Sequence, residues 1–108
     1  VPASLLEEVF ALNEELDDVR EMRASGAPED AWRARLATAA GPIEAKRAEH
    51  EAQLQELSTR WDALQDGDDA GRQAVLNALR ERVLERNYIN NLLATIEREA
   101  TGTGGPQL

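Results

Sequence analysis

The stretch Ser4–Val19, SLLEEVFALNEELDDV, predicts a helix with more apolar surface than one core face needs. Five apolar residues at alternating spacings of four and three form the pattern of a core-facing helix: Leu5, Val9, Leu12, Leu16 and Val19. Leu6 and Phe10 lie beside this face, and their stripe runs on into Glu14, Asp17 and Asp18. This flank suits docking of a partner with apolar and basic features. A core face wide enough to include Leu6 and Phe10 is the alternative.

The signals that start and stop helices predict three of them. Ser4 and Glu7 form a capping box for a helix over residues 4–25, and Gly26 and Pro28 end it. A second helix over residues 28–66 keeps one apolar register through Pro42, which predicts a single helix bent there, with two shorter helices as the alternative. A third helix, capped by Asp68 or Asp69, covers residues 69–100.

Residues 1–100 therefore form one all-α domain, and we expect residues 101–108 to be a flexible tail. The architecture is an antiparallel three-helix bundle or an L-shaped helical hairpin. Trp32 and Trp61 are the expected core anchors. Arg47 and His50 share the apolar register, so the middle of the second helix should be only partly buried. The third helix has a core face and, beside it, a second apolar stripe at Leu84, Tyr88 and Leu92; the core face is Val75, Leu76, Leu79, Val83, Ile89, Leu93 and Ile96.

Composition and charge exclude several classes of function. The chain has 108 residues, no cysteine and a net charge of −9, which excludes disulfides and argues against a general nucleic-acid binder. Residues 4–25 carry a net charge of −5 and residues 70–99 a net charge of +1, so the last helix can lie favourably beside the first. No apolar run is long enough to span a membrane and no signal peptide is evident, so we expect a soluble cytoplasmic protein. The start at Val1 predicts a piece of a longer protein.

The residues predict no enzyme, no cofactor and no metal site. The single histidine, His50, is followed by Glu51, and Leu54 occupies the place of the second histidine of a zincin motif. No serine has a base placed near it by sequence, and no glycine-rich phosphate loop is present. The many carboxylates are expected to be solvated or to belong to a docking surface.

Two segments resemble the C-terminal helical domain of HscB-type J-domain co-chaperones, which serve iron–sulfur cluster assembly. Residues 5–18, LLEEVFALNEELDD, are similar to the opening helix of that family, and residues 88–97, YINNLLATIE, to its closing helix. The resemblance implies an L-shaped three-helix domain that binds an iron–sulfur scaffold protein and delivers it to a DnaK-type chaperone. It places the roles in partner binding on the following residues: Leu6, Phe10, Glu14, Asp18 and Tyr88.

The chain also departs from the family pattern. Glu7 stands where the family often has a methionine, and Ala11 where it often has an acid. The His-Pro-Asp tripeptide of the J-domain is absent, so this chain cannot stimulate the chaperone. Either a J-domain lies upstream of Val1 in the parent protein, which the start at Val1 favours, or the chain is a stand-alone relative.

The rival hypothesis is structural. A coiled-coil or bundle segment would serve only oligomerisation, with the second helix as the interface of a homodimer. Neither hypothesis involves a nucleic acid or a membrane, and a carboxylate bundle that binds metal has little support because the E-x-x-H motif is missing.

Overall fold

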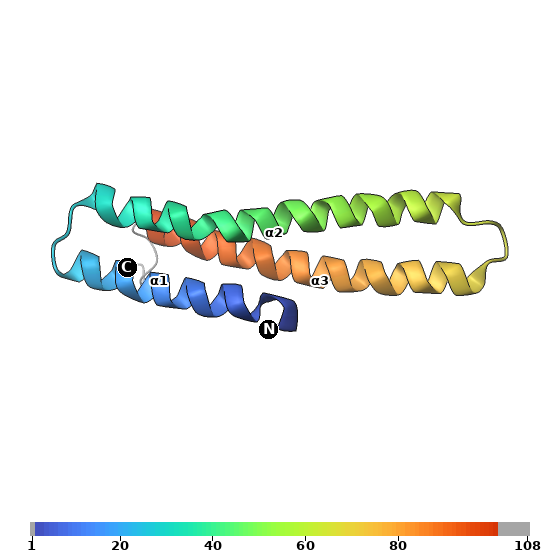
Figure 1. The fold of residues 1–108 in the computed structure, drawn as a ribbon, viewed down its shortest axis with the longest axis horizontal. Helices are drawn as coiled ribbons and strands as arrows, with labels where there is room; N and C mark the ends of the chain where they lie inside the picture. The colour runs from blue at the N-terminus through green and yellow to red at the C-terminus, as the bar shows by residue number, and fades with distance from the viewer. Residues whose placement is uncertain (1, 102–108) are drawn as a thin grey trace, which may run out of the picture.

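Three antiparallel α-helices follow a short 3₁₀ turn in the computed structural model, which describes residues 2–101 (Figure 1). The turn η1 spans Ala3–Leu5, and the helices α1, α2 and α3 span Leu6–Ala24, Glu29–Ala63 and Asp69–Ala100. No strand occurs within the described range, and the expected all-α antiparallel fold is confirmed. The expected tail lies outside the described residues, except for Thr101.

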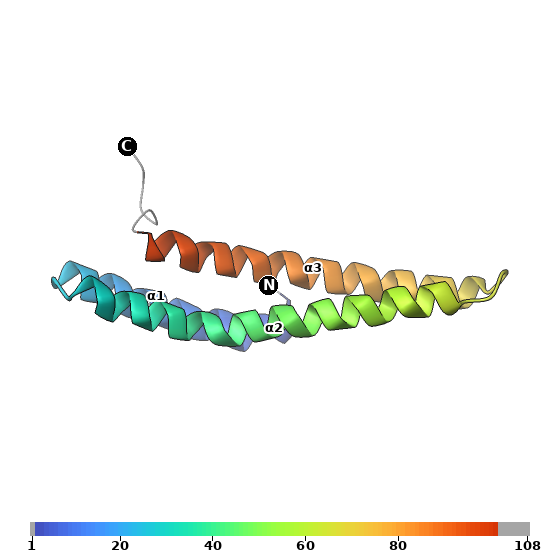
Figure 2. The same ribbon diagram turned by 90° about the horizontal axis from the view of Figure 1, so that it is seen from above.

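The molecule is a rod with principal extents of 64 × 24 × 24 Å, so the L-shape implied by the resemblance is not its form. Helices α2 and α3 form a hairpin over the whole length, and α1 lies along only the half that contains the α1–α2 turn (Figures 1 and 2). The other half, residues 51–84, consists of α2 and α3 alone; we call it the distal hairpin. A third helix laid lengthwise on a hairpin produces a rod.

Helix α1 ends as its sequence predicts. Gly26 has a φ of +83°, a left-handed conformation that glycine adopts without steric cost. The Gly26 N–H donates to the Arg23 carbonyl at 3.2 Å, and the Ala27 N–H donates to the Met22 carbonyl at 2.9 Å. This pair of bonds is a Schellman motif, which satisfies carbonyl groups left free at the end of a helix.

The two expected N-caps have different outcomes. The Asp68 carboxylate accepts a hydrogen bond from the Gly71 N–H at 2.9 Å, so the cap of α3 is confirmed. The capping box of Ser4 and Glu7 is wrong, because Ser4 lies inside η1 and α1 starts without a side-chain cap. The Ser4 hydroxyl instead lies close enough to the Glu85 carboxylate of α3 to lower the pKa of that carboxyl.

Helix α2 continues through Pro42, which confirms one helix instead of two. Proline has no N–H, so the Thr38 carbonyl, four residues earlier, lacks its usual helical hydrogen bond. Figure 2 shows that α2 curves along its length, with its concave side toward α3.

The core lies where all three helices meet. Its buried apolar residues come from every element: Leu5, Leu12, Leu16, Val19, Trp32, Leu36, Ala40, Ile43, Ile89 and Ile96. Trp32 is the core anchor that the sequence predicted, with 7% of its surface exposed. The prediction for Trp61 is wrong, because 37% of its surface is exposed. Trp61 lies two residues before the end of α2, in the distal hairpin, where no third helix covers it.

The middle of α2 is more buried than expected. Only 4% of the His50 surface is exposed, whereas Arg47 is exposed as expected. Burial of a polar ring is tolerated because both nitrogens have partners. The Nδ1 atom lies 3.0 Å from the Lys46 carbonyl, and the Nε2 atom lies 2.6 Å from the Glu85 carboxylate.

Candidate docking surface

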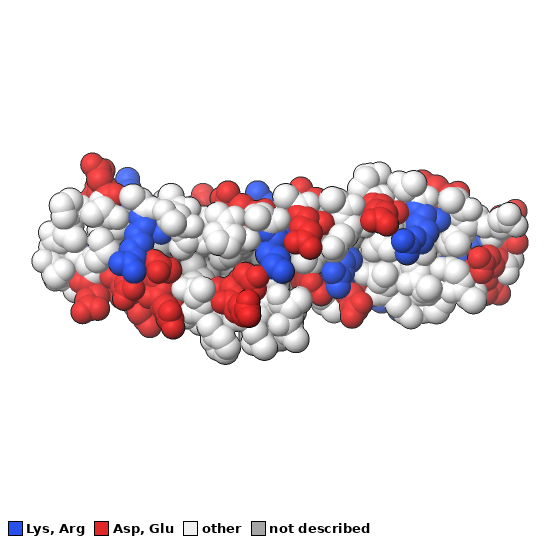
Figure 3. Space-filling model, in the orientation of Figure 1, with Lys and Arg blue, Asp and Glu red and all other residues white. Residues whose placement is uncertain are grey.

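Leu6 and Phe10 lie outside the core of the bundle. Their exposed fractions are 39% and 64%, whereas the neighbouring core-face residues Leu12, Leu16 and Val19 are buried. A wider core face would have buried both side chains, so that alternative is not the arrangement adopted. In Figure 3 the lower edge of the rod, which α1 forms, carries red carboxylates and white side chains that protrude over the N-terminal half of the helix.

The two carboxylates assigned to this surface differ in their surroundings. Glu14 is exposed and has no ion pair or hydrogen bond with another residue in the range 2–101. Asp18 is paired with Arg35 of α2 at 2.7 Å. Arg35 also donates to Glu15 at 2.7 Å, and this bond lowers the pKa of the Glu15 carboxyl. Glu14 is therefore the acid that is free to meet a basic partner, while Asp18 would have to share Arg35.

Tyr88, the fifth residue assigned to this surface, lies on α3. Its ring is half-buried and packs against the core cluster. Helices α1 and α3 run in the same direction (Figure 1), and the ion pair between Arg20 and Glu99 joins residues 79 positions apart. This register places Tyr88 level with the turn between Leu6 and Phe10. We call the five predicted residues (Leu6, Phe10, Glu14, Asp18 and Tyr88) the α1 docking surface.

A buried carboxylate fastens the other end of α1 to α3. Only 3% of the Glu99 surface is exposed, and its two oxygens accept hydrogen bonds from two arginines of α1. Arg20 donates to Oε1 at 2.7 Å and Arg23 donates to Oε2 at 3.0 Å. The Arg23 guanidinium also lies over the Trp32 ring, 4.8 Å from its centroid. The net charges of the two helices predicted a favourable contact; in this contact the acidic α1 supplies the cations and α3 supplies the anion.

A second polar cluster fastens the beginning of α1. Burial of the Glu85 carboxyl acts to raise its pKa, but the hydrogen bond with His50, the nearby Ser4 hydroxyl and the charge of Arg82 outweigh this effect, so the pKa is lowered. Arg82 donates to Glu85 at 2.9 Å and to Gln53 of α2 at 3.0 Å. The cluster therefore joins η1, α2 and α3 at the point where the three-helix half meets the distal hairpin.

The lowered pKa of Glu85 predicts an acid-side loss of stability. A carboxyl with a lower pKa in the folded state contributes stability above its unfolded pKa of about 4.3, and this is lost as pH falls through the folded pKa. We expect Glu85→Gln to lower the free energy of unfolding at pH 7 by about 1–3 kcal/mol. The difference from wild type should shrink toward pH 3.

Urea titrations from pH 3 to pH 7 measure this difference. The matched control is Glu15→Gln, which also removes a carboxylate with a lowered pKa, at a more exposed position. Its effect should be smaller, because exposed ion pairs contribute little. A difference between Glu85→Gln and wild type that stays constant with pH would contradict the assignment.

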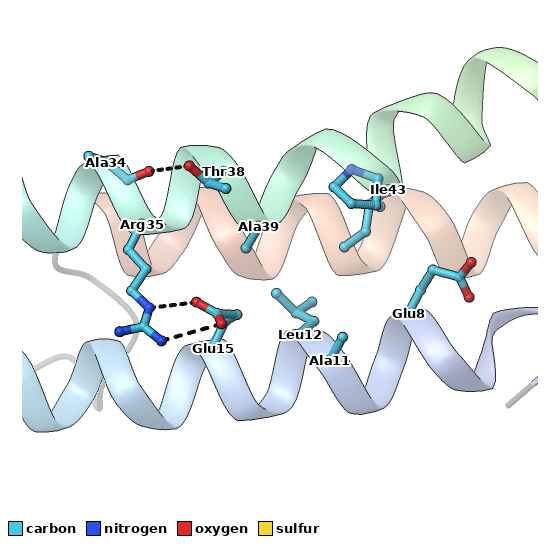
Figure 4. A pocket seen from close by; sticks show the side chains of 10 residues that line it. Glu8, Ala11, Leu12, Glu15, Ala34, Arg35, Thr38, Ala39 and Ile43 are labelled. Carbon is cyan, nitrogen blue, oxygen red and sulfur yellow. Dashed lines mark hydrogen bonds and ion pairs between the residues drawn. The ribbon is translucent and has the colours of Figure 1, made fainter.

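An open groove lies on the other side of α1, between α1 and α2 (Figure 4). Its volume is about 520 Å³, and its lining is mostly small or apolar, including Ala11, Ala39 and Ile43. Arg35 reaches across it to Glu15, as Figure 4 shows, and Lys46 lies 3.6 Å from Glu8. These cations and acids already neutralise one another. The groove thus has no free charge that would select a ligand.

Leu84 is the exposed apolar residue that the site assignment from sequence left out. It belongs to the stripe of Leu84, Tyr88 and Leu92, and 67% of its surface is exposed. The sequence signal for it is the four-residue spacing of this stripe beside the core face. The sequence did not show that Tyr88 and Leu92 pack against the core while Leu84 extends beyond α1.

No protein-family model, curated protein or solved structure matches the chain. Within residues 2–101, no three histidine, aspartate or glutamate side chains are grouped so that they could hold a metal ion. None of the helices in that range has a stretch both long and apolar enough to cross a membrane.

Proposed function

We propose that this chain is a non-catalytic protein-binding domain of the HscB type. It docks an iron–sulfur scaffold protein, or another client, for delivery to a DnaK-type chaperone. The observation that carries the proposal is the exposure of Leu6 and Phe10 on a helix whose other large apolar residues face the core. Exposed apolar side chains of this size, next to a free carboxylate at Glu14, are typical of a protein interface.

The mechanism follows from the chemistry of the α1 docking surface. A partner groove buries Leu6 and Phe10 and contacts the edge of Tyr88, which supplies most of the affinity. Glu14 attracts and orients a basic residue of the partner. Asp18 provides a second carboxylate, which contacts the partner while it stays paired with Arg35. The polar clusters of Glu99 and Glu85 lie at the two ends of α1 and keep its backbone in place. The loss of conformational entropy when a partner binds is therefore small. Contact with the chaperone would require a J-domain, which this sequence does not contain.

Phe10→Ala is the variant that tests this proposal. It should weaken binding of an iron–sulfur scaffold protein at least tenfold, which corresponds to about 1.4 kcal/mol or more. The fold should persist, because a side chain 64% exposed contributes little to the core. Isothermal titration calorimetry measures the binding, and circular dichroism checks the helices.

The matched control is Trp61→Ala, which removes another exposed aromatic residue but from the distal hairpin. It should bind the scaffold protein as wild type does. If the wild-type domain does not bind, the proposed partner is wrong. If Phe10→Ala unfolds the domain, Phe10 supports the fold and the docking surface loses its main residue.

A second candidate function is oligomerisation through the distal hairpin. The exposed side chains of Trp61 and Leu84 favour it, because a two-helix hairpin leaves apolar surface that another hairpin can cover. Light scattering over a range of concentrations separates the two functions. A monomer at every concentration would remove oligomerisation as the function.

A further inference from the structure

A second apolar surface lies on α3, in the distal hairpin, past the N-terminal end of α1. It is an open groove of about 390 Å³ lined by Leu76, Leu79, Arg80, Val83 and Leu84. Leu84 has the largest exposed fraction, 67%, among the exposed large apolar side chains of residues 2–101. The sequence predicted Leu76, Leu79 and Val83 as part of the core face, but they are only half-buried. The uncovered sides of these residues form the groove.

Leu84, at one edge of this groove, belongs to the same stripe of α3 as Tyr88 of the α1 docking surface. Leu84 precedes Tyr88 by four residues on α3, which is about one helical turn. Tyr88 in turn lies level with Leu6 and Phe10 of α1.

The α1 docking surface and the groove on α3 each carry one free charge, and the two charges are opposite in sign. Glu14 is a free carboxylate at the α1 end. At the other end, Arg80 has no ion pair or hydrogen bond with another residue in the described part of the chain. By the register of α1 against α3, Glu14 lies level with residue 93 of α3, so the two charges are about 20 Å apart along the rod.

We propose that the partner bound by Leu6 and Phe10 extends onto α3 and fills this groove. The part of the partner that enters the groove carries apolar side chains and an acidic residue that pairs with Arg80. About 20 Å away, its basic residue meets Glu14. The opposite charges give the partner one orientation along the rod, because reversal would place like charges together at both ends. This inference rests on the proposed function and specifies the chemistry of its partner.

Two variants test the groove with an iron–sulfur scaffold protein as the probe. Leu84→Ala should weaken binding about five- to tenfold, and Arg80→Glu should weaken it by at least as much, because it turns an attraction into a repulsion. Arg47→Glu is the matched control: an exposed arginine of α2 receives the same charge reversal and should change the dissociation constant less than twofold. Urea unfolding should be unchanged for Leu84→Ala.

The outcomes separate the groove from the α1 docking surface. If the wild type binds and Phe10→Ala does not, while Leu84→Ala and Arg80→Glu bind as wild type, the groove is not used and the proposed function stands. If the wild type does not bind, both proposals fail. Sedimentation velocity of the chain alone identifies the other occupant: a wild-type dimer that Leu84→Ala converts to a monomer would assign the groove to a second copy and overturn the inference.

Discussion

Replacement of both Arg20 and Arg23 by methionine should lower the free energy of unfolding by about 3 kcal/mol. The two arginines are the hydrogen-bond donors to Glu99, whose side chain is 4% exposed. Loss of both leaves a buried carboxylate without a counter-charge, which typically costs about 3–5 kcal/mol. We expect the lower value of this range because the side chains of Arg20 and Arg23 are 54% and 32% exposed. Water can therefore reach the Glu99 carboxylate once these side chains are shortened. Thermal and urea unfolding followed by circular dichroism measure the change.

A third substitution distinguishes charge from packing. Addition of Glu99→Met to the double variant removes the buried charge and should recover most of the lost stability, since an apolar group of similar length replaces the carboxylate. Methionine keeps the apolar stems of Arg20 and Arg23. The contact of the Arg23 guanidinium with Trp32 is lost in both variants, so it does not affect their comparison. If the triple variant is as unstable as the double variant, the arginines act through packing and the charge assignment is wrong.

The second large effect is expected at the centre of the bundle. Ile89 on α3 is fully buried, at 0% exposure, and belongs to the cluster shared by the three helices. Ile89→Ala should lower the free energy of unfolding by about 3–4 kcal/mol, because it removes buried methyl groups and leaves a cavity. For a domain of this size, that loss corresponds to a fall in melting temperature of well over 10 °C.

Leu84→Ala is the matched control for Ile89→Ala. It shortens an aliphatic side chain of the same size on the same helix, but at a position 67% exposed. Its effect on the free energy of unfolding should stay within about 0.5 kcal/mol. Equal effects of the two substitutions in urea titrations would mean that the distal hairpin contributes as much to stability as the three-helix half, contrary to the packing described above.

Polar clusters lie at both ends of α1. The Glu99 cluster holds the C-terminal half of α1, and the Glu85 cluster lies beside Ser4 in the turn that precedes Leu6. Between them, Leu12 and Leu16 bury the inner face. Leu6 and Phe10 are thus presented from a fixed backbone, so a partner need order only their side chains.

Much of the fold follows from local signals. Gly26 ends α1, Asp68 caps α3 and the apolar register of α2 passes through Pro42, each for a reason contained within a few neighbouring residues. The exposure of Leu6 and Phe10 was one of two arrangements that the 4-3 spacing allowed. Periodicity measures the angle between residues around one helix, so it separates the two stripes without showing which of them a neighbour covers.

The sequence by itself determined the number of helices, their ends to within a few residues, and the inner face of α1. Only the tertiary structure decided that Ser4 lies near Glu85, that His50 is buried, that Trp61 is exposed, and that an open groove is lined by Leu84. The physical reason is the length of α1. It covers half of the α2–α3 hairpin, so the same apolar pattern is buried in one half and open to solvent in the other.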